Sequence, residues 1–419
     1  MNPRTLVLQA TVIALLPSLP AAQGTPSALI GGAFNAAAGP MIQRQVWCTP
    51  GVPLCLPVLG PPVMPFAGGT AYDPGTQTIW NSDGLLLTGL SALSVPPCAP
   101  VCPPVPCPGL PAGAFVCGLA FAEDTRSLWV IDSTPALMEL TFVGGPCPVP
   151  LRRCGLAGVI PPTHTPGGLA YSEKLRMVLY SVSMWGVVPP NNLVFIAPSN
   201  APCAPVCMVP WNACGAVAAL GAITGLAYDD CTDTMYATDG ALLANGVLRF
   251  VPPNCQLLRQ QCCNLPVIAA YYGLCIEPSH PVARGMSCTA APCPNCPALA
   301  MSTTSDPTLG NARFALQVSN APAGSVLICM LGPGPCTPGI PVLCGLYYPI
   351  LPPAPVMFGI VGLGGPAPCG GSGAAALPVP MDVSLCGSTV CVQGLVLCLA
   401  APGPGVGLTN ALDLTITDT

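Results

Sequence analysis

The stretch Gly225-Leu226-Ala227-Tyr228-Asp229-Asp230-Cys231-Thr232-Asp233-Thr234-Met235-Tyr236-Ala237-Thr238-Asp239-Gly240 decides the fold. Two short runs of strand-forming residues flank an Asp-rich segment, so the stretch predicts a strand, a tight turn and a second strand. Related hairpins begin at Gly69, Gly118 and Gly168, and a degraded copy begins at Gly273. A repeat near fifty residues, with about four strands in each unit, indicates the blades of a β-propeller.

The segments between these hairpins carry pairs of cysteines. Four pairs share the spacing Cys-x6-Cys: Cys48/Cys55, Cys147/Cys154, Cys207/Cys214 and Cys255/Cys262. We expect each pair to be a disulfide within its own hairpin, worth on the order of 2–3 kcal/mol. Cys231, in the turn of the opening stretch, has no counterpart in the other copies, and its partner does not follow from the sequence.

The order of the two hairpin types along the chain predicts how the ring closes. The first cysteine hairpin precedes every Gly-type hairpin, and the last Gly-type hairpin is followed by none. Strands around 43–58 are therefore expected to complete the last blade beside 268–287, which removes an open sheet edge. The sequence predicts a five-bladed propeller over 24–287. Six blades is the alternative, if 25–42 and 288–300 supply another pair of strands.

The repeat stops after residue 287. Residues 288–302 are rich in Cys and Pro and predict a stapled linker. Beyond them, short alternating segments separated by Pro and Gly predict an antiparallel β-sandwich over 303–419. The expected strands are 311–318, 325–331, 356–361, 375–379, 390–397 and 412–416.

Composition supports an all-β fold and excludes some partners. The chain has 57 Pro and 46 Gly in 419 residues, which disfavours long helices. Hydrophobic residues make up 52%, enough for a packed core, whereas charged residues make up only 6%. Eleven Lys and Arg cannot form the basic surface that nucleic acid requires, and the same shortage argues against an anionic membrane surface as partner.

The amino terminus predicts export. Arg4 precedes an apolar stretch, 6–19, and small residues follow at 20–24, so residues 1–23 are interpreted as a signal peptide. A membrane anchor is the alternative, but the stretch is shorter than the roughly 20 residues of a span. We expect no transmembrane segment after cleavage. The 26 cysteines indicate an oxidising compartment.

Two resemblances carry this further. The Gly-Leu-Ala-Tyr-Asp start and the Met-Tyr-Ala-Thr-Asp-Gly end of the opening stretch resemble blades of NHL-type and related six-bladed propellers, which show a Gly-Ile-Ala-Val-Asp-Pro and Ile-Tyr-Val-Ala-Asp pattern. The C-terminal region resembles a module of secreted bacterial proteins in its segments 310–311, 320–325, 392–397 and 408–412. These resemblances imply a secreted or cell-surface protein of bacterial extracytoplasmic type. They transfer no active-site residues.

Cysteine and aspartate offer candidate metal chemistry. Cys293-Pro294-Asn295-Cys296 is a CxxC motif that could be redox-active or hold zinc, but a structural disulfide is the favoured interpretation. Aspartates recur at the hairpin turns: Asp73, Asp83, Asp132, Asp229, Asp233 and Asp239. Calcium is one interpretation, whereas Asx turns are favoured because no Asp-x-Asp-x-Asp loop is present. We therefore expect no cofactor, with calcium as the alternative.

Catalytic and aromatic candidates are few. A catalytic site would need a base, and the better placed of the two histidines is His164, with Glu277 and Glu123 as partners across the central channel. Trp80, Trp129, Tyr180 and Tyr236 share one repeat position and are expected in the core. Trp47, Trp185 and Trp211 are off-register and are the candidate exposed contacts.

Two functions remain open from the sequence. The first is a secreted, disulfide-stabilised, non-catalytic binding or surface/matrix structural protein, with protein or envelope components as partners. The second is a lactonase-like hydrolase or lyase acting in the channel. Convergence of His164, Glu277 and Glu123 at one channel mouth would favour the enzyme.

Overall fold

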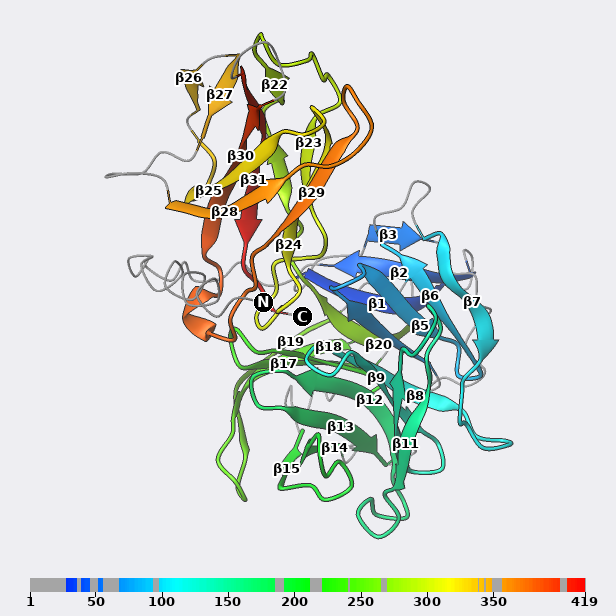
Figure 1. Ribbon diagram of the computed structural model, residues 1–419. Coiled ribbons are helices and arrows are strands. Elements are labelled where there is room, and N and C mark those ends of the chain that lie inside the picture. Colours follow the sequence, from blue (N-terminus) through cyan, green and yellow to red (C-terminus); the bar gives the residue numbers. More distant parts are fainter. Residues whose placement is uncertain are drawn as a thin grey trace. The chain divides into compact units, whose positions relative to one another are not determined.

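The computed structural model (Figure 1) describes residues 28–35, 39–45, 52–55, 68–92, 98–184, 192–211, 221–239, 242–264, 270–337, 339–342, 344–348, 356–399 and 405–418. The regular secondary structure of these residues is β-strand, apart from one short 3-10 helix, Val383–Leu385. They divide into two compact units, 26–278 with 418–419, and 279–417. The described part of the chain contains no helix with the length and apolar character needed to cross a bilayer. The predicted signal peptide lies outside the described residues.

The first unit is a propeller of five four-stranded antiparallel sheets, here named blades 1 to 5 (Figure 1). Blade 1 contains β20 (Ala270–Glu277), β1 (Ala28–Asn35), β2 (Gly39–Gln45) and β3 (Val52–Cys55). Blade 2 contains β4 (Gly69–Asp73), β5 (Thr78–Ser82), β6 (Leu86–Ser91) and β7 (Pro100–Pro106), and blade 3 contains β8 (Val116–Ala122), β9 (Ser127–Asp132), β10 (Ala136–Thr141) and β11 (Val149–Gly155). Blade 4 contains β12 (Thr165–Ser172), β13 (Met177–Ser183), β14 (Asn192–Pro198) and β15 (Cys207–Pro210), and blade 5 contains β16 (Gly225–Asp229), β17 (Thr234–Thr238), β18 (Leu242–Arg249) and β19 (Gln256–Asn264).

The ring closes through the amino-terminal strands, as predicted. The inner strands contact one another in the cyclic order β20, β4, β8, β12, β16 and again β20. Strand β1 pairs with β20, with Leu29 opposite Ile276. Three amino-terminal strands, rather than one hairpin, complete blade 1. Neither segment considered for a sixth blade forms one, because 28–35 is β1 and Cys288–Thr289 (β22) pairs with β31 in the second unit.

The Gly-type hairpins share one turn geometry. Four-residue turns join the first two strands of blades 2 to 5, and each places its last residue in the left-handed region at φ of 52–53°: Gln77, Arg126, Arg176 and Asp233. In blade 2, Asp73 Oδ1 accepts the backbone N–H groups of Gly75 and Thr76, and Asp229 does the same in blade 5. These are the Asx turns that the sequence predicts.

Aromatic side chains of the second strands fill the space between blades. Trp80 is 2% exposed and Trp129 is 1% exposed, and both lie in apolar clusters that two neighbouring blades share. Tyr180 and Tyr236 occupy the same repeat position and are also buried. The predicted core role of these four residues is confirmed.

Three described disulfides of the first unit join neighbouring blades, which corrects three of the predicted pairs. Cys102 is bonded to Cys147, Cys154 to Cys203, and Cys207 to Cys255. The predicted pairs Cys147–Cys154, Cys207–Cys214 and Cys255–Cys262 are therefore wrong. The physical reason is facing direction: the cysteine of an outer strand turns toward the apolar interface with the next blade, away from its own turn. The predicted Cys48–Cys55 pair lies outside the described side chains.

The second unit contains a larger and a smaller antiparallel sheet and a separate two-stranded sheet. The larger sheet has the order β21 (Val282–Arg284), β31 (Gly405–Thr415), β30 (Thr389–Cys398), β25 (Val326–Pro333) and β28 (Val356–Gly362), with β22 also on β31. The smaller sheet has the order β23 (Ala300–Thr303), β24 (Ala315–Ala321) and β29 (Gly371–Ala376), and β26 (Ile340–Val342) pairs with β27 (Gly345–Tyr347). All six predicted strands overlap observed ones, although the fourth, 375–379, shares only its first two residues with β29.

The segment predicted as a linker, 288–302, is part of this second unit. Strands β21 and β22 pair with β31, and Cys288, Cys293 and Cys296 are bonded to Cys344, Cys398 and Cys369. The units divide at Pro278 and Ser279 instead of at 287. This cysteine-rich segment is cross-linked into the second unit, because each of its three cysteines is bonded to a cysteine far away in the sequence.

Candidate functional site at one mouth of the ring

Carboxylates gather where the inner strands end. Each inner strand runs through Gly-x-x-Tyr or a close variant and then reaches an acidic or turn residue, so the repeat places these residues at the same mouth of the ring. We call this set the acidic rim: Asp73, Glu123, Asp124, Glu173, Asp229, Asp230, Asp233 and Glu277. It contains eight of the 16 Asp and Glu residues of the chain, which makes it the first candidate for chemistry.

The channel behind the rim is nearly filled by side chains. The cavity along it has a volume of about 30 Å³, room for roughly two water molecules. Its walls come from the equivalent positions of the five inner strands: Ala71, Tyr72, Leu119, Ala120, Phe121, Leu169, Ala170, Tyr171, Leu226, Ala227, Tyr228, Leu274, Cys275 and Ile276. A typical substrate pocket is ten times larger or more.

Glycines narrow the channel at the start of each inner strand. A Cβ atom on Gly168 would lie 2.4 Å from the backbone nitrogen of Leu226, and one on Gly273 would lie 2.3 Å from that of Thr70. Gly69, Gly118 and Gly225 show the same close approach to the next inner strand. The repeated Gly of the Gly-Leu-Ala-Tyr pattern is therefore required because the five inner backbones touch around the axis.

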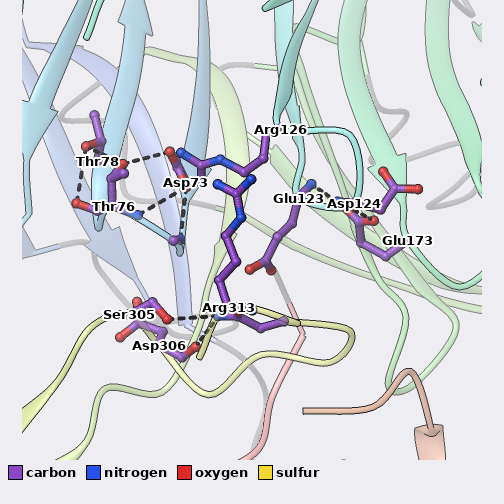
Figure 2. A network of polar contacts seen from close by, with 12 residues as sticks. Asp73, Thr76, Thr78, Glu123, Asp124, Arg126, Glu173, Ser305, Asp306 and Arg313 are labelled. Atoms are coloured by element: carbon purple, nitrogen blue, oxygen red, sulfur yellow. Dashed lines mark hydrogen bonds and ion pairs between the residues drawn. The ribbon is translucent and has the colours of Figure 1, made fainter. Parts of the chain in front are cut away.

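Ion pairs connect the rim between neighbouring blades. The Arg126 guanidinium of blade 3 lies 2.7 Å from Asp73 of blade 2, and Figure 2 shows the two side chains directed at each other. Lys174 of blade 4 lies 2.8 Å from Asp233 of blade 5. These contacts use rim carboxylates to hold hairpin turns together.

Buried carboxylates also accept backbone N–H groups from the preceding blade. Glu173 of blade 4 accepts the N–H groups of Glu123 and Asp124 of blade 3 (Figure 2). Asp230 of blade 5 repeats the arrangement, accepting from the Ser172 hydroxyl and, at 3.0 Å, from the Lys174 N–H.

The position that would continue this pattern in blade 1 is Pro278, which has no carboxylate. There Asp418 accepts the N–H of Asp230 instead. A carboxylate supplied from a distant part of the sequence thus continues the same contact.

The electrostatics of the rim follow from burial. Desolvation raises the pKa of Glu173 well above its usual range, and the neighbouring Asp124 adds to the shift. Burial raises the pKa of Asp230 to about 6, against the lowering effect of its hydrogen bonds. Burial also raises the pKa of Asp73, and Arg126 opposes the rise. Raised carboxyl pKa values accompany many active sites, but here each shifted group is held in an inter-blade contact.

The structure does not bring the three catalytic candidates together. His164 directly precedes β12, whereas Glu123 follows β8 and Glu277 ends β20, so His164 and the two glutamates lie at opposite ends of the inner strands. An eight-residue strand such as β12 spans roughly 25 Å. Glu277 is engaged by the Nε and Nη2 groups of Arg44. His164 is 8% exposed, and its burial lowers its pKa.

The second histidine lies in the other unit. His280 Nδ1 is 2.9 Å from the buried carboxylate of Asp306. The Thr163 hydroxyl lies 3.2 Å from His164 Nδ1, and it belongs to the adjacent residue of the same loop.

The aromatic contact candidates are only partly described. Trp211 was expected to be exposed, but it is 1% exposed and packs in the cluster between blades 4 and 5, and its backbone N–H bonds the Asn192 carbonyl. Its position beyond β15 turns the indole inward, which a repeat alignment does not reveal. Trp47 and Trp185 lie outside the described residues.

The CxxC sulfurs are engaged in separate bridges. Cys293 is bonded to Cys398 and Cys296 to Cys369, as the structural interpretation of this motif requires. One other group of ligand atoms, Cys336, Cys391 and Asp413, comes within 4.8 Å in the described residues. Its two sulfurs form a disulfide, and Asp413 accepts from the Cys336 N–H and from Arg284, so these atoms act as a structural cluster.

Sequence reasoning missed the partners of the rim. Arg126, Lys174 and Arg44 were not singled out, nor was Asp418. The position of Arg126 in its turn could have been found by aligning the repeats, because Gln77 and Arg176 occupy the same turn position. Asp418 carried none, since its contact depends on the three-dimensional path of the chain.

Comparison with known proteins finds similarity among solved structures alone, at low identity. No protein-family model matches the sequence, and no curated protein sequence matches it. Among solved structures, the β-propeller domain of Cps50 (Swd1) from Myceliophteria thermophila has a TM-score of 0.32 at 9% identity, over 55% of this chain and 72% of that one. A putative 6-phosphogluconolactonase from Bacteroides uniformis has a TM-score of 0.32 at 12% identity, over 57% and 83%. A chain of a mitotic checkpoint complex has a TM-score of 0.29 at 8% identity, over 84% and 81%.

Proposed function

We propose that this chain is a secreted, non-catalytic binding or matrix structural protein, built on a disulfide-stabilised propeller. The observation that carries the proposal is the use of the acidic rim. Asp73, Glu173, Asp230 and Asp233 hold neighbouring blades together, so these carboxylates are committed to the fold. The nearly filled channel supports the same conclusion.

The outer strands supply the proposed contact surface. Each of four outer strands carries an exposed apolar residue: Val101 on β7 is 40% exposed, Leu151 on β11 is 59%, Met208 on β15 is 45% and Leu258 on β19 is 40%. Prolines within β7, β11 and β15 leave edge positions without an N–H donor, which limits strand-to-strand aggregation. Exposed apolar side chains of this kind suit protein or envelope components as partners.

The binding half of the proposal is tested by sedimentation. Purified secreted protein is mixed with the insoluble envelope fraction of the producing cells, in low and high salt and with a mild detergent. We expect co-sedimentation that survives high salt and is lost in detergent. Leu151→Asp together with Met208→Asp should abolish it, whereas Leu399→Asp, an equally exposed site in the other unit, should not. Binding that salt abolishes would contradict an apolar contact.

The alternative function is a lactonase-like hydrolase or lyase. Its support is the cluster of carboxylates with raised pKa values at the mouth. A pH-stat assay with a panel of lactones and esters distinguishes the two functions. We expect no turnover above buffer. Turnover that disappears in Glu123→Gln or Glu277→Gln, with folding intact, would overturn the non-catalytic proposal.

Secretion and the NHL-like origin of the blades remain parts of this proposal. The inter-blade and sandwich disulfides support an oxidising compartment, which agrees with the predicted signal peptide. Sequencing of the mature amino terminus after expression with the native leader tests secretion, and we expect cleavage near residue 23.

A further inference from the structure

Three disulfides of the propeller follow one rule. Each joins a cysteine of one blade's outer strand to a cysteine in the turn before the outer strand of the next blade. Cys102 of blade 2 meets Cys147 of blade 3, Cys154 meets Cys203 of blade 4, and Cys207 meets Cys255 of blade 5. The sequence separations are 45, 49 and 48 residues, about one repeat each.

The face of the strand decides which cysteine takes part. Residues directly opposite in an antiparallel pair point to the same face. Cys154 is opposite Leu137, which lies in the cluster between blades 3 and 4. Cys207 is opposite Ile196, which lies in the cluster between blades 4 and 5. The bonded cysteine is therefore the one that faces the next blade.

Blade 5 offers two adjacent cysteines in its outer strand, and only one meets this condition. Cys263 is opposite Leu243, and both belong to the cluster between blades 5 and 1. Cys262 is opposite Ala244 and packs against the cluster between blades 4 and 5. Both cysteines are disulfide-bonded. The Cys-x6-Cys spacing would pair Cys262 with Cys255. The side chain that points to blade 1, however, is that of Cys263, so we take Cys263 as the link to blade 1.

The same rule applies where blade 1 meets blade 2. On the backbone register, Cys55 of β3 is opposite Ile42, which lies in the cluster between these blades. Cys98, in the turn before β7, is buried in that cluster and is disulfide-bonded. The sequence between β2 and β3 contains a single cysteine, Cys48. The side chains of Cys48 and Cys55 lie outside the described residues, so register and sequence carry this step.

We propose that Cys263 is bonded to Cys48 and Cys55 to Cys98, which completes a belt of five inter-blade disulfides around the propeller. Each bridge forms when two thiols lose their protons and pass two electrons to an external disulfide of an oxidoreductase, which is reduced to the dithiol. The belt makes ring closure covalent. The amino-terminal strands that complete blade 1 are then tied to blade 5 on one side and to blade 2 on the other.

Disulfide mapping of the full secreted chain tests the belt. Free thiols are blocked with a maleimide at low pH, the protein is digested without reduction, and linked peptides are sequenced. Partial reduction with two successive alkylating reagents separates the adjacent Cys262 and Cys263. We expect one linked pair containing Cys48 and Cys263, and another containing Cys55 and Cys98. A Cys48–Cys55 or a Cys48–Cys262 pair would overturn the proposal.

A matched pair of variants gives an independent readout. In unfolded, unreduced protein, Cys263→Ser should raise maleimide labelling of Cys48 from near zero to near one per chain. Cys262→Ser should leave Cys48 unlabelled. The reverse pattern would overturn the assignment. If Cys263→Ser is not secreted, the peptide map of the unaltered protein still decides the pairing.

Discussion

Cys154 of blade 3 is bonded to Cys203 of blade 4, 49 residues further along the chain, with their Cα atoms 6.2 Å apart. The bridge spans one full repeat, so it connects two blades that otherwise meet mainly through apolar packing and a few ion pairs at the turns. With 6% charged residues, the chain has few ion pairs to add at these interfaces. Because charged residues are scarce and cysteines are abundant, disulfides between blades are the main additional stabilisation that this composition allows.

Removal of this bridge should destabilise the propeller. Cys154→Ala with Cys203→Ala releases a loop of about fifty residues in the unfolded chain, so we expect a loss on the order of 2–4 kcal/mol in the free energy of unfolding. Guanidinium unfolding measures it. Cys275→Ala is the control, because Cys275 is a free thiol and its repeat equivalents are Ala71, Ala120, Ala170 and Ala227. A loss no larger than that of the control would argue against a stabilising role.

The glycines of the inner strands should tolerate no side chain. Gly168→Ala places a Cβ atom 2.4 Å from a backbone nitrogen, which the ring can relieve only by moving an inner strand. We expect a loss of about 3 kcal/mol or a failure to fold. Gly155→Ala is the matched control, since its Cβ would meet nothing within 4 Å. Equal stability of the two variants would contradict the close packing of the inner strands.

Loss of the ion pair between Arg126 and Asp73 should destabilise the fold more than loss of an exposed ion pair. Asp73 has a side chain only 2% exposed, so Arg126→Ala leaves a buried carboxylate without its cation. We expect a loss on the order of 3 kcal/mol, and Asp73→Asn in the same background should recover part of it. Arg176→Ala removes a 77% exposed guanidinium, 3.6 Å from Asp124, and should cost about 0.5 kcal/mol or less. Similar losses for both arginine variants, measured by urea unfolding, would count against this distinction.

Stability should fall as pH rises from 5 to 7. The pKa of Asp230 is about 6 in the folded chain, and that of Glu173 is also raised, whereas unfolded carboxyl groups titrate near 4. The folded state therefore binds protons more tightly, and its advantage is lost as pH passes through the folded pKa. The midpoint of thermal unfolding should drop by a few degrees over this range.

Two substitutions isolate the groups responsible for the pH effect. Asp230→Asn with Glu173→Gln should flatten the pH dependence. Asp382→Asn should not, because a hydrogen bond from Ser384 lowers the pKa of the exposed Asp382. A midpoint that rises between pH 5 and 7 in the unaltered protein would show that other carboxylates dominate.

The repeat made the propeller predictable from the sequence. Hairpins at Gly69, Gly118, Gly168 and Gly225 predict four blades. A cysteine hairpin at the amino terminus with no Gly-type hairpin before it predicts that the ring closes there. The core role of Trp80 and Trp129 followed from their shared repeat position, and the Asx turns followed from Asp73 and Asp229. These features depend on local sequence and period, which a single chain displays.

The disulfides and the rim were not predictable in the same way. Cys147 and Cys154 are close in sequence, but β11 turns Cys154 toward blade 4, and spacing does not report the face of a strand. The predicted exposure of Trp211 is wrong for the same reason. Contacts such as that of Asp418 with Asp230 join residues 188 positions apart, so no local pattern could indicate them.

Unfolding with and without a reductant tests most directly whether disulfides hold the blades together. Secreted protein is unfolded in guanidinium chloride, either untreated or after full reduction verified by thiol counting. We predict that reduction lowers the unfolding midpoint sharply, whereas raising the salt concentration in a parallel urea series changes stability little. An unchanged midpoint in fully reduced protein would show that apolar packing alone maintains the ring, and would contradict the structural role assigned to the inter-blade disulfides.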